Sequence, residues 1–216
     1  MTIGDSEEIR KALKLRWDAT WCALGVTPRP ATIFDALVAA YSESGRYYHS
    51  LKHLEECFSH FDSAMQLAHS PAEIEIAIWF HDAIYDTRKH DNEERSAAWA
   101  VNAVRNSGAS SEVAQRIGDM VLATKHQVAP NTADASLFVD VDLSILGASA
   151  TRFDEYERQI RQEYAWVPEK EFQQGRAKLL RDISMRERIY ATEFFQKRLE
   201  TAARENLKRS LSKLES

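Results

Sequence analysis

The sequence predicts an all-α protein, a helical bundle that continues into a long helical C-terminal arm. Gly and Pro are scarce, at 7 and 5 among 216 residues, so few positions interrupt a helix. Apolar residues recur every three or four positions, and no stretch alternates apolar and polar residues as a half-buried strand would. With 44% hydrophobic residues, the chain is long enough for one sizeable core and short for two. We therefore expect a single domain over residues 1–216.

The helices expected in the first half differ in their apolar faces. The stretch EIEIAIWF at 73–80 is apolar on nearly every side, as in a helix surrounded by protein. Ser70, as a capping residue, and Pro71 mark its start. The preceding helix carries an apolar stripe from Leu51 to Met65. In chain order, the expected helices are one around Trp17 and Trp21 that ends at the break TPRPA (27–31), one from about Thr32 to Tyr41, and the two just described.

The second half is expected to be helical to the end. Gly108 and Gly147 stand where C-terminal caps are expected. The last stretch, RLETAARENLKRSLSKLES, spaces its leucines along one helix, which fits packing on the body of the protein or on a second copy in a homodimer. The expected helices run from Asp91 or Asn92 to Ser107, from about Ser110 to Lys125, from about Leu137 to Leu146, from about Thr151 to Ala165, and in one or two long pieces from Pro168 onward.

The net charge of the chain argues against two classes of partner. A formal net charge of −5 argues against a dedicated nucleic-acid surface or an anionic-membrane surface. The N-terminus is polar and acidic, and no apolar run reaches the length of a membrane span, so we expect a cytoplasmic protein. Cys22 and Cys57 form no CxxC pair, and both are expected to be buried thiols.

Two polar residues end the most apolar helix and need partners. His81 and Asp82 follow EIEIAIWF directly, and burying them alone costs several kcal/mol. A metal ion would partner both; the alternative is hydrogen bonding at the helix end. In RYYHSLKHLEE, His49 and His53 are spaced i and i+4 and so share a helix face away from the apolar stripe, for which an exposed histidine face is the alternative.

A second carboxylate lies among apolar residues further along the chain. In LFVDVDLSILG, Asp140 and Asp142 are two residues apart, and charged groups in such company are usually paired or coordinating. The sequence does not decide which of the two points inward.

The ordered pattern H…HD…D resembles that of the HD-domain superfamily of metal-dependent phosphohydrolases, in particular a branch of small bacterial predicted HD phosphohydrolases. The resemblance implies an all-helical fold, with a metal-site core at approximately 31–147 and C-terminal helices at 151–216. It implies a metal-dependent hydrolase of a small phosphoester, such as a nucleotide, acting by attack of metal-activated water. The alternatives are a non-catalytic nucleotide- or metal-binding signalling module, oxidative cleavage with iron, and a purely helical interaction protein whose histidines are coincidental. The implied metal ligands are His53, His81, Asp82 and Asp142.

Such a ligand set favours one divalent ion of a particular kind. Two imidazoles and two carboxylates suit Mn, Fe, Co, Ni or Zn, whereas Mg is disfavoured by the histidines. An ion of this kind supplies hydroxide near neutral pH and polarises a phosphorus centre.

Three further residues are candidates for catalysis. His49 corresponds to the general acid of the YHNxxH motif of cyclic nucleotide phosphodiesterases, although YHSLKH lacks the Asn. Asp86 stands like the second acid of the HDxxED motif of guanosine tetraphosphate hydrolases, but HDAIYD has Tyr85 in place of Glu, so that substrate is not favoured. Glu93 could orient water in a second shell, or, as an acidic residue in a first turn, complement the helix dipole.

Several cations are candidates for binding a phosphorylated substrate. Arg46 lies just ahead of the His helix, which ties it to the proposed site, and His126 has the alternative of being an extra ligand for a second metal. For each of them, a solvated surface position is the alternative. The candidates are Arg46, Lys125, His126, Arg158 and Arg161.

Overall fold

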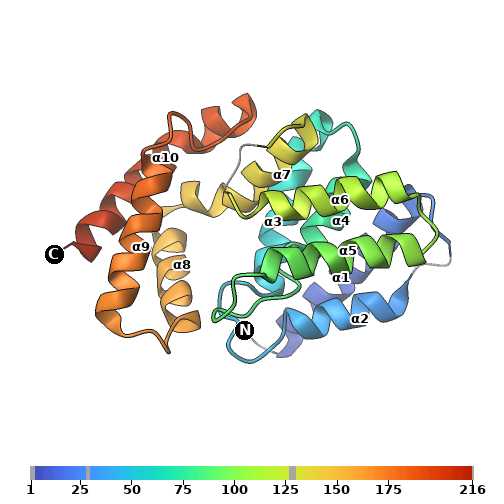
Figure 1. Ribbon diagram of the computed structural model, residues 1–216, viewed down its shortest axis with the longest axis horizontal. Helices are drawn as coiled ribbons and strands as arrows, with labels where there is room; N and C mark the ends of the chain where they lie inside the picture. The colour runs from blue at the N-terminus through green and yellow to red at the C-terminus, as the bar shows by residue number, and fades with distance from the viewer. Residues whose placement is uncertain (1–2, 28–29, 127–129, 216) are drawn as a thin grey trace. The chain divides into compact units, whose positions relative to one another are not determined.

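The computed structural model describes residues 3–27, 30–126 and 130–215. Within these residues it contains α-helices, two short 3-10 helices and no strand (Figure 1), which confirms the all-α prediction. The break predicted at 27–31 includes Pro28 and Arg29, which lie outside the described residues. The helices are α1 (Ile3–Ala23), α2 (Ala31–Ala40), α3 (Leu51–Ala64), η1 (Met65–Leu67), α4 (Pro71–Phe80), α5 (Asn92–Asn106), α6 (Ser111–Ala123), α7 (Ala133–Asp142), η2 (Leu143–Gly147), α8 (Ala150–Glu163), α9 (Glu169–Ser184) and α10 (Glu193–Leu214).

The chain divides into two compact units, Met1–Val139 and Asp140–Ser216. The boundary falls inside α7, so the first residues of this helix belong to one unit and its last three to the other. That the whole chain forms a single domain stays a prediction. No helix in the part of the chain that the structure describes has the length and apolar character needed to cross a membrane.

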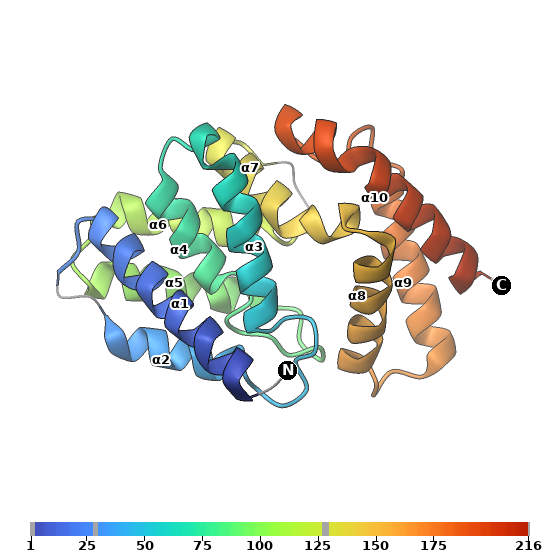
Figure 2. The same cartoon turned by 180° about the vertical axis from the view of Figure 1, so that it is seen from behind.

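Helix α4 is the centre of the first unit. It contacts α1, α3, α5 and α6, and in Figures 1 and 2 α1 and α3 lie on one side of it and α5 and α6 on the other. Trp79 packs against Trp17 of α1 with ring centroids 5.3 Å apart, and against Phe34 of α2 at 6.0 Å. All residues from Glu73 to Phe80 are buried, as the apolar pattern on every side predicts.

The two carboxylates of this buried helix have partners. Glu75 accepts a hydrogen bond from Arg16 at 2.5 Å and another from the Thr20 hydroxyl, and Glu73 accepts two from Arg116 at 2.6 and 2.9 Å. Buried charges persist in a core when they are paired in this way. The salt bridges thus allow Glu to occupy positions that face neighbouring helices.

The start of α4 is capped from another helix. Ser70 is the N-cap residue and Pro71 follows it as predicted, but the Ser70 side chain makes no capping hydrogen bond. Instead, the Asp134 carboxylate of α7 accepts hydrogen bonds from the backbone N–H groups of His69 and Ser70 at 2.8 and 2.9 Å. A carboxylate at a helix N-terminus satisfies unpaired donors and complements the helix dipole.

In the second unit the C-terminal arm consists of two helices, α9 and α10, which pack against each other (Figure 2). Helix α10 also packs on η2, where Gly147 approaches Leu199 so closely that an added Cβ would lie 2.6 Å from Leu199 Cβ. Close packing therefore requires glycine at 147. Gly108, by contrast, has a φ of +93° and is the left-handed cap that the sequence predicts. The buried Asn206 donates to the carbonyls of Leu146 and Ala148 at 2.8 and 2.9 Å.

Candidate metal centre

The N-terminal turn of α3 and the C-terminal end of α4 bring two histidines together in the first unit. His53 lies in the first turn of α3, and His81 directly follows the last residue of α4. Both rings are buried, each residue being 2% exposed. The alternative of an exposed histidine face on α3 therefore does not hold for His53.

The two imidazoles direct their Nε2 atoms at each other, 3.0 Å apart. His81 Nδ1 lies 2.8 Å from the Ile78 carbonyl oxygen. A carbonyl oxygen only accepts, so Nδ1 carries the proton, and in the neutral ring Nε2 keeps its lone pair. The local helix end therefore holds His81 in the tautomer that can bind a metal through Nε2.

Asp82 places one carboxylate oxygen among three ring nitrogens. Its Oδ2 lies 3.1 Å from His81 Nε2, 3.7 Å from His53 Nε2 and 3.9 Å from His49 Nε2. The Asp82 N–H donates to the Tyr41 hydroxyl at 3.2 Å. Burial, and then the nearby charge of Asp82, raise the pKa of Tyr41 well above its usual range, so this hydroxyl keeps its proton.

Arg46 connects the turn before α3 to the turn that contains His81 and Asp82, which we call the His–Asp turn. Its side chain is only 3% exposed, and it donates to the carbonyls of Asp82 and Ala83 at 2.5 and 2.9 Å. The guanidinium also lies over the rings of Tyr41 and Tyr85, 5.2 and 5.5 Å from their centroids. Its donors thus serve the backbone of the candidate site, and the predicted contact of Arg46 with substrate stays a prediction.

His49 lies outside the helix that was expected to carry it. Helix α3 begins at Leu51, so His49 and His53 are not a helical i, i+4 pair, although their ring centroids are 5.9 Å apart. The His49 ring stacks on Tyr85 at 4.1 Å with an interplanar angle of 31°. His49 is therefore beside Asp82 and partly accessible, and its role as general acid stays a prediction.

Cys57 is a member of the cluster that the sequence interpretation missed. Its buried Sγ lies 3.6 Å from His53 Nε2 and 3.7 Å from His53 Nδ1. The ligand atoms of His53, Cys57 and His81 all lie within 4.8 Å of one another. The i, i+4 spacing of His53 and Cys57 on α3 is a signal that could have found it. Cys22, by contrast, is exposed, so its predicted burial is wrong.

The other catalytic candidates of the first unit have structural contacts of their own. Asp86 is exposed, and its Oδ1 accepts the Arg88 N–H at 2.9 Å, within the loop that follows the His–Asp turn. Glu93 is half-buried in the first turn of α5. The roles proposed for Asp86 and Glu93 in catalysis stay predictions.

The two cations predicted at the end of this helix, Lys125 and His126, lie just after α6, which ends at Ala123. Lys125 forms an ion pair with Glu94 of α5, and this contact raises the Lys125 pKa. His126 has a positive φ of 54°, a backbone conformation that non-glycine residues seldom adopt. Binding of a phosphate by Lys125 or His126 stays a prediction.

Asp140 and Asp142 belong to the second unit, and the structure distinguishes them. The fully buried Asp140 accepts hydrogen bonds from the N–H groups of Ala191 and Thr192, both at 2.7 Å, and from the Thr192 hydroxyl at 2.6 Å. Burial raises the Asp140 pKa, against the effect of these three bonds. Asp140 therefore anchors the start of α10, whereas Asp142 is the half-buried last residue of α7.

The two arginines predicted on α8 differ in their surroundings. Arg161 donates to the carbonyls of Tyr164 and Val167 at 2.7 and 3.0 Å and to Glu169 at 2.8 Å, which closes the turn between α8 and α9. Arg158 is exposed. Their proposed contacts with substrate stay predictions.

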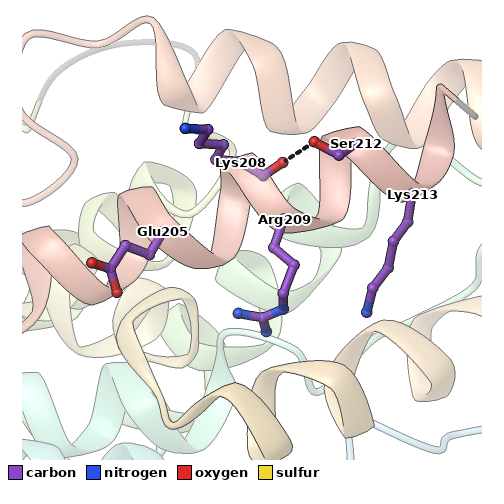
Figure 3. A pocket seen from close by; sticks show the side chains of 5 residues that line it. All are labelled: Glu205, Lys208, Arg209, Ser212 and Lys213. Carbon is purple, nitrogen blue, oxygen red and sulfur yellow. Dashed lines mark hydrogen bonds between the residues drawn. The ribbon is translucent and has the colours of Figure 1, made fainter.

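A surface pocket on α10 contains none of the predicted site residues (Figure 3). Arg209 and Lys213, which line it, lie 3.1 and 3.2 Å from Asp154 of α8, so both cations already have a carboxylate partner. The full lining is Glu205, Lys208, Arg209, Ser212 and Lys213.

The cluster in the first unit fits a divalent metal ion. Two nitrogens bound at about 2.1 Å to one ion are separated by about 3.0 to 3.4 Å at angles between 90° and tetrahedral, and the two Nε2 atoms are 3.0 Å apart. Imidazole, carboxylate and thiol donors together suit transition metals better than magnesium.

Comparisons with protein-family models, with curated proteins and with solved structures found no match to this chain.

Proposed function

We propose that the protein is a metal-dependent hydrolase of a small phosphoester, such as a nucleotide. The observation that carries the proposal is the position of Asp82 Oδ2 within 3.9 Å of the Nε2 atoms of His49, His53 and His81. Two imidazole nitrogens and one carboxylate oxygen, on a largely buried site, are a donor set that a catalytic transition-metal ion uses, with His49 beside them. The proposed ligands in this unit are His53, His81 and Asp82.

We include Asp142 as the fourth ligand because it is the last carboxylate of the ordered pattern H…HD…D, by which the chain resembles HD-domain phosphohydrolases. Asp140 is not proposed, because both of its carboxylate oxygens hold the start of α10.

A divalent ion held by these residues would supply a nucleophile near neutral pH and charge stabilisation for phosphoryl oxygens. The chain supplies the remaining functions. His81 is kept in the required tautomer by the Ile78 carbonyl. We propose that His49, with a side chain 17% exposed beside Asp82, donates a proton from Nε2 to the leaving oxygen.

The test is hydrolysis of p-nitrophenyl phosphate and bis-p-nitrophenyl phosphate by the parent after loading with Mn²⁺, Fe²⁺, Co²⁺ or Zn²⁺. We expect turnover of one of them that is lost in Asp82→Ala and kept in Asp119→Ala, which removes an exposed carboxylate of the same unit. Metal binding without turnover of either probe, or of a panel of nucleotides, would favour the non-catalytic binding module. Activity that survives in Asp82→Ala would refute the assignment of the site.

A further inference from the structure

Helix α3 presents two potential metal ligands on one face. His53 and Cys57 are separated by four residues, which places them one turn apart. Both side chains are buried, and the Cys57 thiol faces the His53 ring rather than solvent. Their ligand atoms and that of His81 lie within 4.8 Å of one another, so three buried donors from α3 and the end of α4 surround one point.

The distances agree with a shared ion. With metal–sulfur and metal–nitrogen bonds of about 2.3 and 2.05 Å, an ion that holds the two donors at angles of about 90° to 120° separates sulfur from nitrogen by about 3.1 to 3.8 Å. Cys57 Sγ lies 3.6 Å from His53 Nε2. Because Sγ is nearly as close to Nδ1, at 3.7 Å, ligation requires the Cys57 side chain to rotate toward Nε2.

We propose that Cys57 is a thiolate ligand of this metal centre and makes it selective for thiophilic divalent ions, such as Zn²⁺ and Co²⁺, over Mg²⁺ and Mn²⁺. Soft thiolate donors favour Zn²⁺ and Co²⁺, whereas oxygen donors suit Mg²⁺ and Mn²⁺. As the metal–sulfur bond forms, the S–H bond breaks and its proton leaves to solvent. The inference rests on the proposed function for the existence of the metal centre and adds the class of ion.

The test is titration of the metal-free parent with Co²⁺, followed by absorption spectroscopy. Co²⁺ bound by protein ligands gives visible ligand-field bands that are shifted and stronger than those of aqueous Co²⁺, and it gives a near-ultraviolet charge-transfer band only with a thiolate. We expect both signals in the parent and in Cys22→Ser, which removes the exposed cysteine. In Cys57→Ser we expect the ligand-field bands without the charge-transfer band, and a preference for Zn²⁺ over Mn²⁺ reduced by more than about 100-fold, since losing a direct ligand should cost more than the 10- to 100-fold of an outer-shell partner.

The outcomes separate the inference from the proposal on which it rests. No ligand-field bands in the parent would refute the metal centre itself. Ligand-field bands without a charge-transfer band in the parent would refute the thiolate ligand and leave the hydrolase proposal standing. If Cys57→Ser fails to fold, Cys22→Ser still decides, because the chain has two cysteines and a charge-transfer band in that variant can come only from Cys57.

Discussion

Replacement of Arg46 by Met should loosen the candidate site without replacing any proposed ligand. The substitution removes hydrogen bonds to the carbonyls of Asp82 and Ala83, at 2.5 and 2.9 Å. The side chain is 3% exposed, and each bond from a charged donor contributes about 1.5–3 kcal/mol. Methionine keeps part of the packing against Tyr41 and Tyr85, so the unfolding free energy should fall by about 3–5 kcal/mol. Metal affinity should fall by about 10- to 100-fold, as for other outer-shell partners.

Urea unfolding and competition for Zn²⁺ measure these two quantities. The matched control is Arg10→Met, which breaks an exposed ion pair with Asp35 and should change stability by less than about 1 kcal/mol. If Arg46 instead binds substrate, Arg46→Met should raise KM while unfolding free energy and metal affinity match those of the parent. That result would refute the positioning role derived from its contacts.

Two other substitutions, and a third as a control, test the packing of the two units by urea unfolding. Arg16→Met leaves the buried Glu75 without its cation and should cost about 3–5 kcal/mol; a loss below 1 kcal/mol would contradict the pairing. Gly147→Val places Cβ 2.6 Å from Leu199 Cβ and should destabilise the second unit by more than about 2 kcal/mol, whereas Gly175→Ala, at an open helical position with nothing within 4 Å, should stabilise it by about 0.5–1 kcal/mol. Equal effects of the two glycine substitutions would contradict the account of η2 packing.

The sequence predicts the helices well, because their burial depends on local periodicity. The pattern EIEIAIWF predicts a surrounded helix, and Glu73 to Phe80 are indeed buried. The start of the helix is also predicted by Ser70 and Pro71, but its capping group is not. Asp134 is distant in sequence and reaches the helix only through tertiary packing, and no local pattern records such a contact.

The candidate site is predicted in part. The sequence singles out His53 and His81, and the structure brings their rings together, because one follows a buried helix and the other lies on a helix packed against it. Cys57 was missed because a cysteine in a helix reads as an apolar residue until its neighbours are known. The choice between Asp140 and Asp142 also depends on tertiary structure, since the backbone at the start of α10 occupies the Asp140 carboxylate.

The central claim is that His81 and Asp82 hold a metal ion, and elemental analysis of the purified protein tests it most directly. We predict close to one equivalent of a transition metal in the parent, lost in His81→Ala and in Asp82→Ala. His69→Ala, which removes an exposed histidine just before the start of α4, should keep it. Absence of metal from all four proteins, even after incubation with Mn²⁺, Fe²⁺ and Zn²⁺, would contradict the account.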